Sequence, residues 1–376
     1  MKMTISQPEH PTILPIRLTQ DDLRQALKTS RVQRLIALLA FVLIVAAVYW
    51  YNLRSQYVSQ HRAAWRWINA ENSEHFSTET SSHGRFARVT LLETLDSKYL
   101  PRTRKANPQR SGKKRRLIFV GDIHGCLEEL QALLAKARYN PTKDHIIALG
   151  DMINKGSDSK GVLNFLIDQG ASAVRGNHED HILSIVEELQ NSAVTEQPPA
   201  SDTNDAFTSA KVKKKSDSEV NLARSLTKKQ LAWLNALPLI LRIGDVPHMG
   251  EIVAVHGGLI PGLALEKQDP ITIMNMRIID PATRRASQQH FLPGSVPWAE
   301  FWNKYQRLLP VHSALSGRRR AKHTTVVYGH DAKQGLQIRK YTKGLDSGCQ
   351  RGDKLTAWIV SDFARDELVQ VKCKQR

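Results

Sequence analysis

The sequence predicts an α/β fold, because short apolar segments of strand length alternate with amphipathic segments of helical length. Five of the apolar segments also end beside a glycine that is accompanied by Asp, Asn or His. The composition is that of a globular domain, since 41% of the 376 residues are hydrophobic and 24% are charged. These values exclude collagen and a coiled coil, and a total of 3 cysteines excludes a disulfide scaffold.

An apolar run near the N-terminus predicts a membrane-spanning helix. Residues 35–51 read LIALLAFVLIVAAVYWY and contain no charge, proline or glycine. A spanning helix needs about 17–25 such residues, and aromatic residues at one end are typical of a membrane interface. A buried core helix is the first alternative, but core helices seldom stay apolar on every face. A cleaved signal peptide is the second, although the 34 residues before the run are many for a signal peptide.

This run divides the chain into four segments. We expect a short cytosolic tail at 1–34, a transmembrane anchor at 35–51, a stalk with a basic linker at 52–116, and the folded domain at 117–376. Slightly more basic residues precede the run than follow it, which favours a cytosolic N-terminus. The chain is therefore expected to be a single-pass type II protein with its folded domain in a lumen.

The chain carries a large excess of positive charge. Lys and Arg number 54 and Asp and Glu number 36, so the formal net charge is +18. Such an excess indicates a polyanionic partner, namely nucleic acid, anionic lipid or polyphosphate, and charge alone does not choose among them. Basic residues gather at 102–116 and 318–322. The first segment is interpreted either as a solvated linker or, with the second, as a collar that attracts a polyanion to the functional site.

The folded domain begins with the strand pattern LIFV at 117–120. An amphipathic helix is expected at 126–139, a second strand at 146–149, and a second helix at 161–170 that ends at a glycine. Further strand patterns follow at 252–255, 325–328, 356–360 and 368–371. The alternation is typical of a sheet flanked by helices.

A polar stretch interrupts this alternation between about residues 191 and 223. It is rich in Ser, Thr, Asp and Lys and shows no apolar periodicity. We therefore predict a disordered insertion within the domain. Helical order is expected to resume at 226–241.

Polar side chains follow five of the predicted strands at the point where each strand ends. In open α/β sheets, ligands bind at the carboxyl ends of the strands, where several loops converge. The glycines permit tight turns and a close approach of the backbone. The five segments are Gly121-Asp122-Ile123-His124-Gly125, Gly150-Asp151, Gly176-Asn177-His178-Glu179, His256-Gly257-Gly258 and Gly329-His330.

These residue types suit two divalent cations. Carboxylate, amide oxygen and neutral imidazole are ligands for Zn, Mn, Fe and similar metals. One carboxylate can bridge two cations, and Asp151 is our choice for that role. Two cations about 3.5–4 Å apart clamp a phosphoryl group and activate water near neutral pH. A single one of these segments would be weak support, because a lone histidine is more often a satisfied core residue.

Together, GDIHG, GDMINKG, GNHE, HGG and GH resemble the calcineurin-like metallophosphoesterases, specifically the phosphoprotein-phosphatase branch. The resemblance covers about residues 117–371 without the polar insertion. It implies an α/β/β/α sandwich, in which two central mixed sheets are flanked by helices.

The resemblance also implies roles for individual residues. One metal would be held by Asp122, His124 and Asp151. The second would be held by Asp151, Asn177, His256 and His330. His178 would protonate the leaving oxygen, a general-acid role that suits imidazole. The phosphate would be bound by Arg277, Lys155 and Asn177.

Two positions depart from the protein phosphatases of this branch, which have Asp-Arg where this chain has Asn154-Lys155. Asn154 offers no carboxylate to orient the catalytic histidine, and Lys155 is a point charge rather than a planar fork. The segments GDMINKGSDS and MNMR are instead similar to the ApaH-like phosphatases, relatives of bacterial diadenosine tetraphosphatase.

Fungal members of that group with one N-terminal anchor resemble zinc-dependent endopolyphosphatases of the vacuole. The resemblance implies a hydrolase in the vacuolar membrane that cleaves phosphoanhydride bonds of inorganic polyphosphate. It would use two divalent cations, Zn first, with Mn, Co or Fe as other choices. A dinucleoside polyphosphatase or cap-cleaving hydrolase, a protein serine/threonine phosphatase, and an inactive polyanion-binding protein are the alternatives. No specific nucleic-acid partner is predicted.

The cysteines contribute little to this prediction. Cys126 and Cys349 are expected to be small buried hydrophobic residues rather than nucleophiles. Cys373 lies in a basic C-terminal segment. Whether any two of the three form a disulfide is left open.

Overall fold

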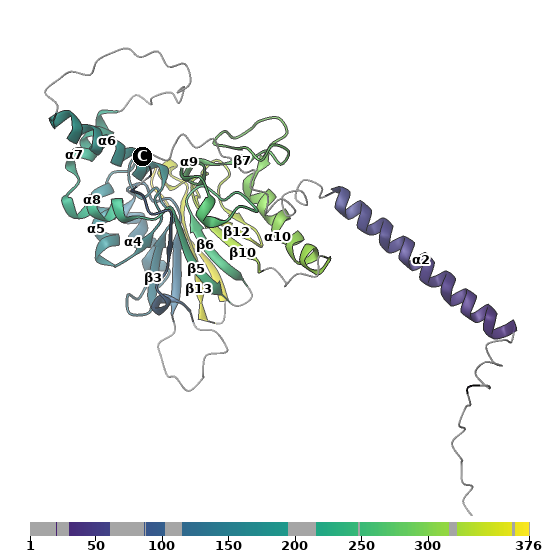
Figure 1. Cartoon of the computed structure of the whole chain (residues 1–376). Helices are drawn as coiled ribbons and strands as arrows, with labels where there is room; N and C mark the ends of the chain where they lie inside the picture. Colours follow the sequence, from purple (N-terminus) through teal and green to yellow (C-terminus); the bar gives the residue numbers. More distant parts are fainter. Residues whose placement is uncertain are drawn as a thin grey trace, which may run out of the picture. The chain divides into compact units, whose positions relative to one another are not determined.

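The structure is a computed structural model that describes residue 20 and residues 30–60, 86, 88–101, 115–194, 216–246, 249–315, 322–362 and 365–375. The chain divides into two compact units, Met1–Arg62 and Ala63–Arg376. A long helix lies in the first unit, and two large sheets with their covering helices lie in the second (Figure 1).

Helix α2, Ser30–Gln60, contains the predicted apolar run. Within it, Gln33–Ser55 is 23 residues long, has a mean hydropathy of 2.2, and is long and apolar enough to cross a membrane. None of this segment is buried against other parts of the protein, whereas a core helix is mostly buried. A signal sequence shares these properties, so the helix alone does not choose between an anchor and a signal.

Two sheets form the centre of the second unit. The five-stranded sheet has the order β14-β13-β2-β3-β4, and the six-stranded sheet has the order β1-β5-β6-β10-β12-β11. In the first sheet β2, β3 and β4 run parallel, and in the second β6, β10 and β12 run parallel. The strands of these two sheets are β1 Leu92–Thr94, β2 Arg116–Val120, β3 Asp144–Ala148, β4 Ser172–Ala173, β5 Ile240–Val246, β6 Gly250–Val255, β10 Thr324–Tyr328, β11 Gln337–Ile338, β12 Thr342–Gly344, β13 Lys354–Ser361 and β14 Arg365–Lys372.

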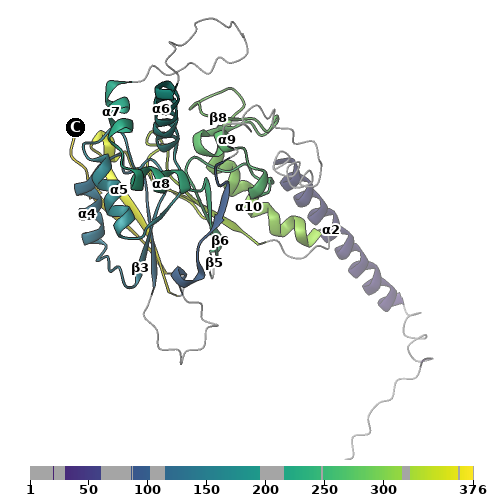
Figure 2. The ribbon, with the colours of Figure 1, turned by 60° about the vertical axis from the view of Figure 1, so that its left-hand side comes forward.

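Helices cover the outer faces of the two sheets. Helices α4, α5 and α8 lie on one side and α10 on the other (Figures 1 and 2). A small third sheet, β8-β7-β9, lies between α9 and α10 in the chain. The remaining elements are α4 Leu127–Lys136, α5 Ser159–Asp168, α6 Asn177–Val194, α7 Asp217–Ser225, α8 Lys228–Ala236, α9 Pro270–Asn275, α10 Trp298–Leu315, β7 Ile278–Ile279, β8 Ala286–Ser287, β9 Val296–Pro297, and the 3₁₀ turns η1 Ser97–Tyr99, η2 Leu265–Lys267 and η3 Cys349–Arg351.

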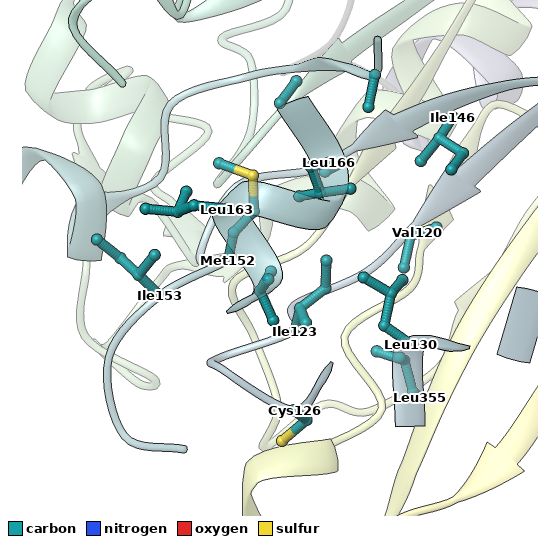
Figure 3. Packing of buried hydrophobic residues seen from close by; sticks show 14 of the residues in the cluster. Val120, Ile123, Cys126, Leu130, Ile146, Met152, Ile153, Leu163, Leu166 and Leu355 are labelled. Carbon is teal, nitrogen blue, oxygen red and sulfur yellow. The ribbon is translucent and has the colours of Figure 1, made fainter. Parts of the chain in front are cut away.

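The alternation of side chains along β2 explains why the fold has four layers. Leu117 and Phe119 point into a core between the two sheets, where they join Ile252 of β6 and Val327 of β10. The intervening residues of β2 point the other way, into a core shared with the helices (Figure 3). All four apolar residues of β2 are fully buried, as expected for a strand covered on both faces. The predicted α/β/β/α sandwich is therefore confirmed.

The prediction of a disordered insertion at about residues 191–223 is wrong at both ends, because helices extend into it from either side. Helix α6 continues to Val194, and α7 begins at Asp217. Ser216 and Glu219 form a capping box at the start of α7, and Ala223 packs into the core beside the helices. A cap and a short apolar stripe are enough to order these residues. The remainder of the insertion, residues 195–215, lies outside the described residues.

The predicted stalk also ends too late. Strand β1 pairs in parallel with β5, and Leu95 is buried in the core between the sheets. These residues belong to the folded domain because β1 extends the six-stranded sheet at its edge. Arg116, the last residue of the predicted stalk, is already the first residue of β2.

Candidate metal centre

All six predicted metal ligands lie together at the carboxyl ends of the parallel strands. The segments after β2, β3 and β4 supply ligands from one sheet, and the segments after β6 and β10 supply them from the other. Two overlapping groups share Asp151, and within each group the candidate ligand atoms lie within 4.8 Å of one another: His124, Asp151 and His178 form one group, and Asp151, His256 and His330 form the other. The predicted ligands are Asp122, His124, Asp151, Asn177, His256 and His330.

Asn177 lies beside the group of Asp151, His256 and His330. His256 Nε2 lies 3.3 Å from Asp151 Oδ1 and 3.1 Å from Asn177 Oδ1. His330 Nδ1 lies 3.0 Å from Asn177 Oδ1 and 3.2 Å from His256 Nε2. This is the set of residues expected for the second metal.

Backbone carbonyls fix which nitrogen each imidazole presents to the centre. His256 Nδ1 lies 2.7 Å from the carbonyl of Leu149, and His330 Nε2 lies 3.0 Å from the carbonyl of Asn275. A carbonyl only accepts, so these nitrogens carry the ring protons. When both rings are neutral, the two nitrogens 3.2 Å apart therefore both present lone pairs, an arrangement that a cation between them would satisfy.

Electrostatics at this group favour positive charge. Burial opposes a charge on His256, yet Asp151 and Asp122 raise the pKa of that imidazole to about 10. Burial likewise opposes ionisation of Asp151, but His256 and His178 hold the pKa of its carboxyl well below the usual range. A cation can take the place of the proton that these groups attract.

The second group lies around His124. Its Nε2 is 3.6 Å from Asp151 Oδ2 and 3.9 Å from Asp122 Oδ2, while its Nδ1 is 3.2 Å from the carbonyl of Ile153. Lys155 Nζ lies 3.2 Å from the same Nε2 and places a positive charge beside it. This is the set expected for the first metal, and the donor types suit Zn, Mn or Fe. The assignment of metal-binding roles to all six residues stays a prediction.

A buried carboxylate without a role in our prediction also lies here. Burial and the negative charge of Asp346, which follows β12, raise the pKa of Asp122 well above its usual range. Asp346 itself is buried and lines the same pocket as His124. The accumulation of buried acids is a further feature that a bound cation would offset.

The backbone at this edge is strained. Among the described residues, seven non-glycine residues have positive φ, and five of them are His124, Asp151, Asn154, Lys155 and His330. Such conformations cost about 1–3 kcal/mol each and persist where the surroundings hold them. Gly329 is required for a different reason, because a Cβ at that position would clash with Asp122 Oδ1.

Glu179 holds the loop that carries Asp151. Its fully buried carboxylate accepts hydrogen bonds from the backbone N–H groups of Asp151, Met152 and Gly176, at 2.8–2.9 Å. Burial and the charge of Asp151 raise the pKa of Glu179 to about 7. The motif GNHE contains Gly176 and Glu179, but the contacts of Glu179 with Asp151 and Met152 could not be predicted, because those residues lie 28 and 27 positions away.

The predicted general acid, His178, lies at the start of α6. Its Nε2 is 3.8 Å from Asp151 Oδ2, and its Nδ1 is 3.1 Å from Asn154 Nδ2. Asn154 in turn donates to Glu219 of α7 at 3.0 Å. The sequence prediction missed Glu219 because it assigned residues 191–223 to a disordered insertion. The pattern Ser216-x-x-Glu219 is the signal that could have located the helix.

A polar pocket of about 230 Å³ opens above the two groups. Arg277 lines it and donates to the carbonyls of Gln288, at 2.9 Å, and His330, at 3.5 Å. Within the described part of the chain, its buried Nε has no hydrogen-bond partner, although it lies 3.7 Å from Asp331 Oδ1 in an ion pair. Lys155 lines the pocket, as do the acid Asp331 and two cations that the prediction did not include, Lys333 and Arg351.

Of the predicted basic collar, residues 102–116 and 318–322, the structure describes only residues 115, 116 and 322, so the collar stays a prediction. Arg116 begins β2 and pairs with Asp144, and Lys322 lies just before β10 and pairs with Asp245. Both therefore lie at the amino ends of strands whose carboxyl ends carry the candidate ligands. Residues 102–114 and 316–321 themselves lie outside the described residues.

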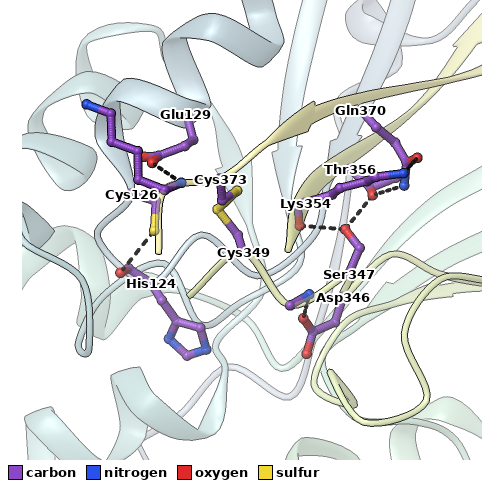
Figure 4. Close-up of a disulfide and its surroundings, with 12 residues drawn as sticks. His124, Cys126, Glu129, Asp346, Ser347, Cys349, Lys354, Thr356, Gln370 and Cys373 are labelled. Carbon is purple, nitrogen blue, oxygen red and sulfur yellow. Dashed lines mark hydrogen bonds between the residues drawn. A yellow bond between two sulfur atoms is a disulfide. The ribbon is translucent and has the colours of Figure 1, made fainter. Parts of the chain in front are cut away.

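A disulfide joins the C-terminal segment to the edge of the pocket. Cys349 and Cys373 are bonded, whereas Cys126 is buried and forms no disulfide (Figure 4). The expectation that Cys349 is a simple buried hydrophobic residue is therefore wrong, because β13 and β14 return Cys373 to it. Cys349 begins η3, whose next two residues, Gln350 and Arg351, line the pocket.

Comparisons with known proteins agree with this geometry. The chain is 28% identical over 306 residues to the zinc-dependent endopolyphosphatase of Saccharomyces cerevisiae, covering 76% of this chain and 87% of that protein. It is 27% identical over 295 residues to the symmetrical bis(5'-nucleosyl)-tetraphosphatase of Nitrosospira multiformis, covering 68% and 94%. The crystal structure of a putative diadenosine tetraphosphatase aligns with a TM-score of 0.53 and 29% identity, covering 76% and 98%.

The family of calcineurin-like phosphoesterases matches residues 115–358. This span contains every candidate ligand and both parallel strand sets, so the predicted family resemblance is confirmed. The chain belongs to the calcineurin-like phosphoesterase family.

Proposed function

We propose that this metal-dependent phosphohydrolase is anchored in a membrane and cleaves phosphoanhydride bonds of inorganic polyphosphate. The observation that carries the proposal is a polar pocket that contains candidate metal ligands and is also lined by Lys155, Arg277, Lys333 and Arg351. The similarity to a zinc-dependent endopolyphosphatase supports the same substrate class.

The centre would hold its two cations with Asp151 between them. His124 and Asp122 would complete one ligand set, and Asn177, His256 and His330 the other. When bound, two divalent cations supply Lewis-acid charge and lower the pKa of water. Zinc is the proposed metal because three imidazoles and a shared carboxylate suit it, and Mn, Co or Fe are compatible with the same donors.

The side chains around the centre would bind the phosphate and assist its departure. Arg277 and Lys155 point positive charge into the pocket and would neutralise the non-bridging oxygens, as would the amide of Asn177. His178 Nε2 faces Asp151 from the pocket side and would donate to the leaving oxygen. Lys333 and Arg351 would bind the next phosphates of a chain.

The composition of the pocket favours polyphosphate over a dinucleoside polyphosphate. Its described lining has Lys and Arg side chains but no Phe, Tyr or Trp on which a base would stack. A dinucleoside tetraphosphatase is nevertheless the second candidate, since relatives of that name match this chain. A protein serine/threonine phosphatase is disfavoured by Asn154-Lys155, which lacks the planar guanidinium of the corresponding enzymes.

Helix α2 would anchor the enzyme as a single-pass type II protein, with the phosphohydrolase domain in the vacuolar lumen. Its exposed apolar surface and the basic residues before it support this orientation. The Cys349–Cys373 disulfide adds support, because such bonds persist in oxidising compartments. Protease protection of sealed membranes tests this placement, since a lumenal domain survives until detergent is added.

The substrate proposal is tested with the purified full-length chain. The protein is stripped of metal and resupplied with Zn, Mn, Co or Fe singly, and phosphate release is measured from long-chain polyphosphate, diadenosine tetraphosphate and a phosphopeptide. We expect activity only after metal is returned, with the highest kcat/KM on polyphosphate. A preference for diadenosine tetraphosphate would replace the substrate proposal with the second candidate, and activity that is unchanged by stripping would overturn the metal centre.

A comparison of a long and a short substrate distinguishes the roles of the cationic side chains in the pocket. Lys333→Ala and Arg351→Ala should raise KM for long-chain polyphosphate by more than they raise KM for pyrophosphate. Arg277→Ala should weaken both substrates equally, because Arg277 lies beside His330 at the centre itself. Equal effects of all three substitutions on both substrates would remove the proposed chain-binding role of Lys333 and Arg351.

A further inference from the structure

We infer that Glu219 is a positioning residue, which acts through Asn154 to hold His178 with Nε2 directed toward the candidate metal centre. The inference rests on the proposed function, because it assumes that His178 donates to the leaving oxygen. It concerns a helix that our sequence prediction had placed in a disordered insertion.

Two contacts fix the orientation of the Asn154 amide. Its Oδ1 accepts from the backbone N–H of Lys155 at 2.8 Å, and its Nδ2 donates to Glu219 Oε1 at 3.0 Å. An ionised carboxylate only accepts and a backbone N–H only donates, so the amide cannot be turned over without losing both bonds.

The same amide nitrogen determines which nitrogen of His178 carries the ring proton. Asn154 Nδ2 lies 3.1 Å from His178 Nδ1, and an amide NH₂ can only donate, so Nδ1 accepts. The proton of the neutral ring is therefore on Nε2, which lies 3.8 Å from Asp151 Oδ2. Nε2 thus presents a hydrogen-bond donor, which stabilises negative charge without transferring its proton, to the side of the pocket where the leaving oxygen would lie.

Glu219 is itself firmly held. Its second oxygen, Oε2, accepts from the backbone N–H of Ser216 at 3.1 Å and contacts the Ser216 hydroxyl at 3.0 Å. Partial burial opposes its ionisation, but hydrogen bonds from Ser216 and Asn154 lower the pKa of Glu219 to about 2. The carboxylate is therefore charged throughout the range in which the enzyme would be assayed.

Packing explains why this contact forms over 65 positions of sequence. Helix α7 lies against the helices beside the five-stranded sheet, with Ala223 in their core and Val220 at its margin. Helix α6, which carries His178, also contributes Ile182 and Ile185 to that core. The position of Glu219 is consequently set by the same packing that sets the position of His178.

A purely structural role of Glu219 makes a different prediction. If it only capped α7, then Ser216→Ala, which removes the other half of the capping box, would have the same effect. If Glu219 positions His178 through Asn154, replacing Glu219 should not lower kcat further in a chain that already lacks the Asn154 side chain. It should also grow with the basicity of the leaving group, because a donor matters most where negative charge accumulates most.

The experiment compares Glu219→Ala, Glu219→Gln, Ser216→Ala, Asn154→Ala and the double variant Asn154→Ala/Glu219→Ala in the metal-loaded full chain. Phenyl phosphate and p-nitrophenyl phosphate serve as substrates with a more and a less basic leaving group. We expect Glu219→Ala to lower kcat by about tenfold, as for other supporting hydrogen-bond partners, with KM changed less than twofold. Glu219→Gln should be intermediate, since the side chain of glutamine has one acceptor oxygen where the carboxylate has two.

Three further results are expected. The loss should be larger for phenyl phosphate, Ser216→Ala should keep kcat within twofold, and Glu219→Ala should have no added effect once Asn154 is alanine. In metal-free protein, ¹⁵N NMR should show the Nε2–H form of His178 in the parent chain and a mixture of ring forms in Glu219→Ala. This signal does not depend on activity.

The outcomes distinguish the inference from the proposed function. Equal losses in Glu219→Ala and Ser216→Ala, or additive losses in the double variant, would overturn the positioning role. So would an unchanged NMR signal of His178 in Glu219→Ala. A parent chain that hydrolyses both aryl phosphates but not polyphosphate would contradict the proposed substrate and leave the positioning result readable.

Discussion

The carboxyl ends and the amino ends of the same strands differ in how their charged side chains are arranged. At the carboxyl ends of β2, β3 and β10, buried acids and imidazoles crowd together and residues such as Asp151 adopt positive φ. At the amino ends, charges are paired off, as in the bond between Arg116 Nε and Asp144 Oδ1 at 2.8 Å. The comparison indicates that one edge concentrates unfavourable interactions that a ligand can offset, whereas the other edge stabilises the sheets.

Substituting the shared carboxylate should have the largest effect. Asp151→Asn removes a charge that both candidate ligand groups use, so we expect kcat/KM for polyphosphate to fall by about a hundredfold or more. The bound metal, measured by elemental analysis, should fall below two ions per chain. Near-normal activity of this variant would contradict the role of the carboxyl edge.

Removing the disulfide tests whether the edge of the pocket depends on its crosslink to the C-terminal segment. Cys349 and Cys373 are 24 positions apart, and a closed loop of that length contributes about 3 kcal/mol in the chain-entropy account. Cys373→Ser should lower the free energy of unfolding by about that amount and raise KM, since η3 carries Arg351. Cys126→Ser is the matched control, because that thiol forms no disulfide. Equal changes in both variants would argue against the crosslink.

The opposite edge supplies a carboxylate to compare with Asp151. Asp144 is buried and accepts from Arg116 and from the backbone N–H of Asn140. Asp144→Asn should therefore lower the free energy of unfolding by about 1–3 kcal/mol while kcat stays within twofold. Denaturant unfolding and polyphosphate assays on the same preparation measure both. A large loss of kcat without a loss of stability would break the distinction between the two edges.

The smallest expected effect is a pH dependence at the amino edge. His145 of β3 stacks on Tyr99 and lies 2.8 Å from Ser172 Oγ through its Nε2. Burial, followed by the charge of Lys98, lowers the pKa of His145 to about 4. Its folded pKa is thus below that of the unfolded chain, about 6.5.

The sign of the effect follows from proton binding. Between pH 6.5 and pH 4 the unfolded chain binds the proton more readily, so the stability due to neutral His145 is complete above pH 6.5 and is lost as the pH falls toward 4. In His145→Gln, the free energy of unfolding should change less between pH 6.5 and pH 4 than it does in the parent chain. It is measured by denaturant unfolding at fixed temperature. If the free energy of unfolding depends on pH equally in the variant and the parent chain, other groups cause the dependence.

Local patterns were sufficient for much of this prediction. Apolar strand segments that end in Gly and Asp or His predicted the α/β sandwich and the family, both confirmed. They also located six side chains that the structure brings together, such as Asp151 and His256, although metal binding by them stays a prediction. The reason is geometric, because parallel strands put their carboxyl ends at one edge whatever their separation in the chain.

Other features required the tertiary structure. The contact between Asn154 and Glu219, the bond between Cys349 and Cys373, and the pairing of Arg116 with Asp144 all join segments with no shared local pattern. The basic collar stays a prediction, because all of its residues except 115, 116 and 322 lie outside the described residues.

The sequence by itself determined which chemical groups end each strand, and therefore the family and the type of centre. Only the folded chain decided which partners orient those groups, because the packing of α7 and of the β13–β14 hairpin depends on apolar contacts between distant segments. Local residue patterns specify strands, turns and ligand types, whereas long-range packing sets the hydrogen bonds around them.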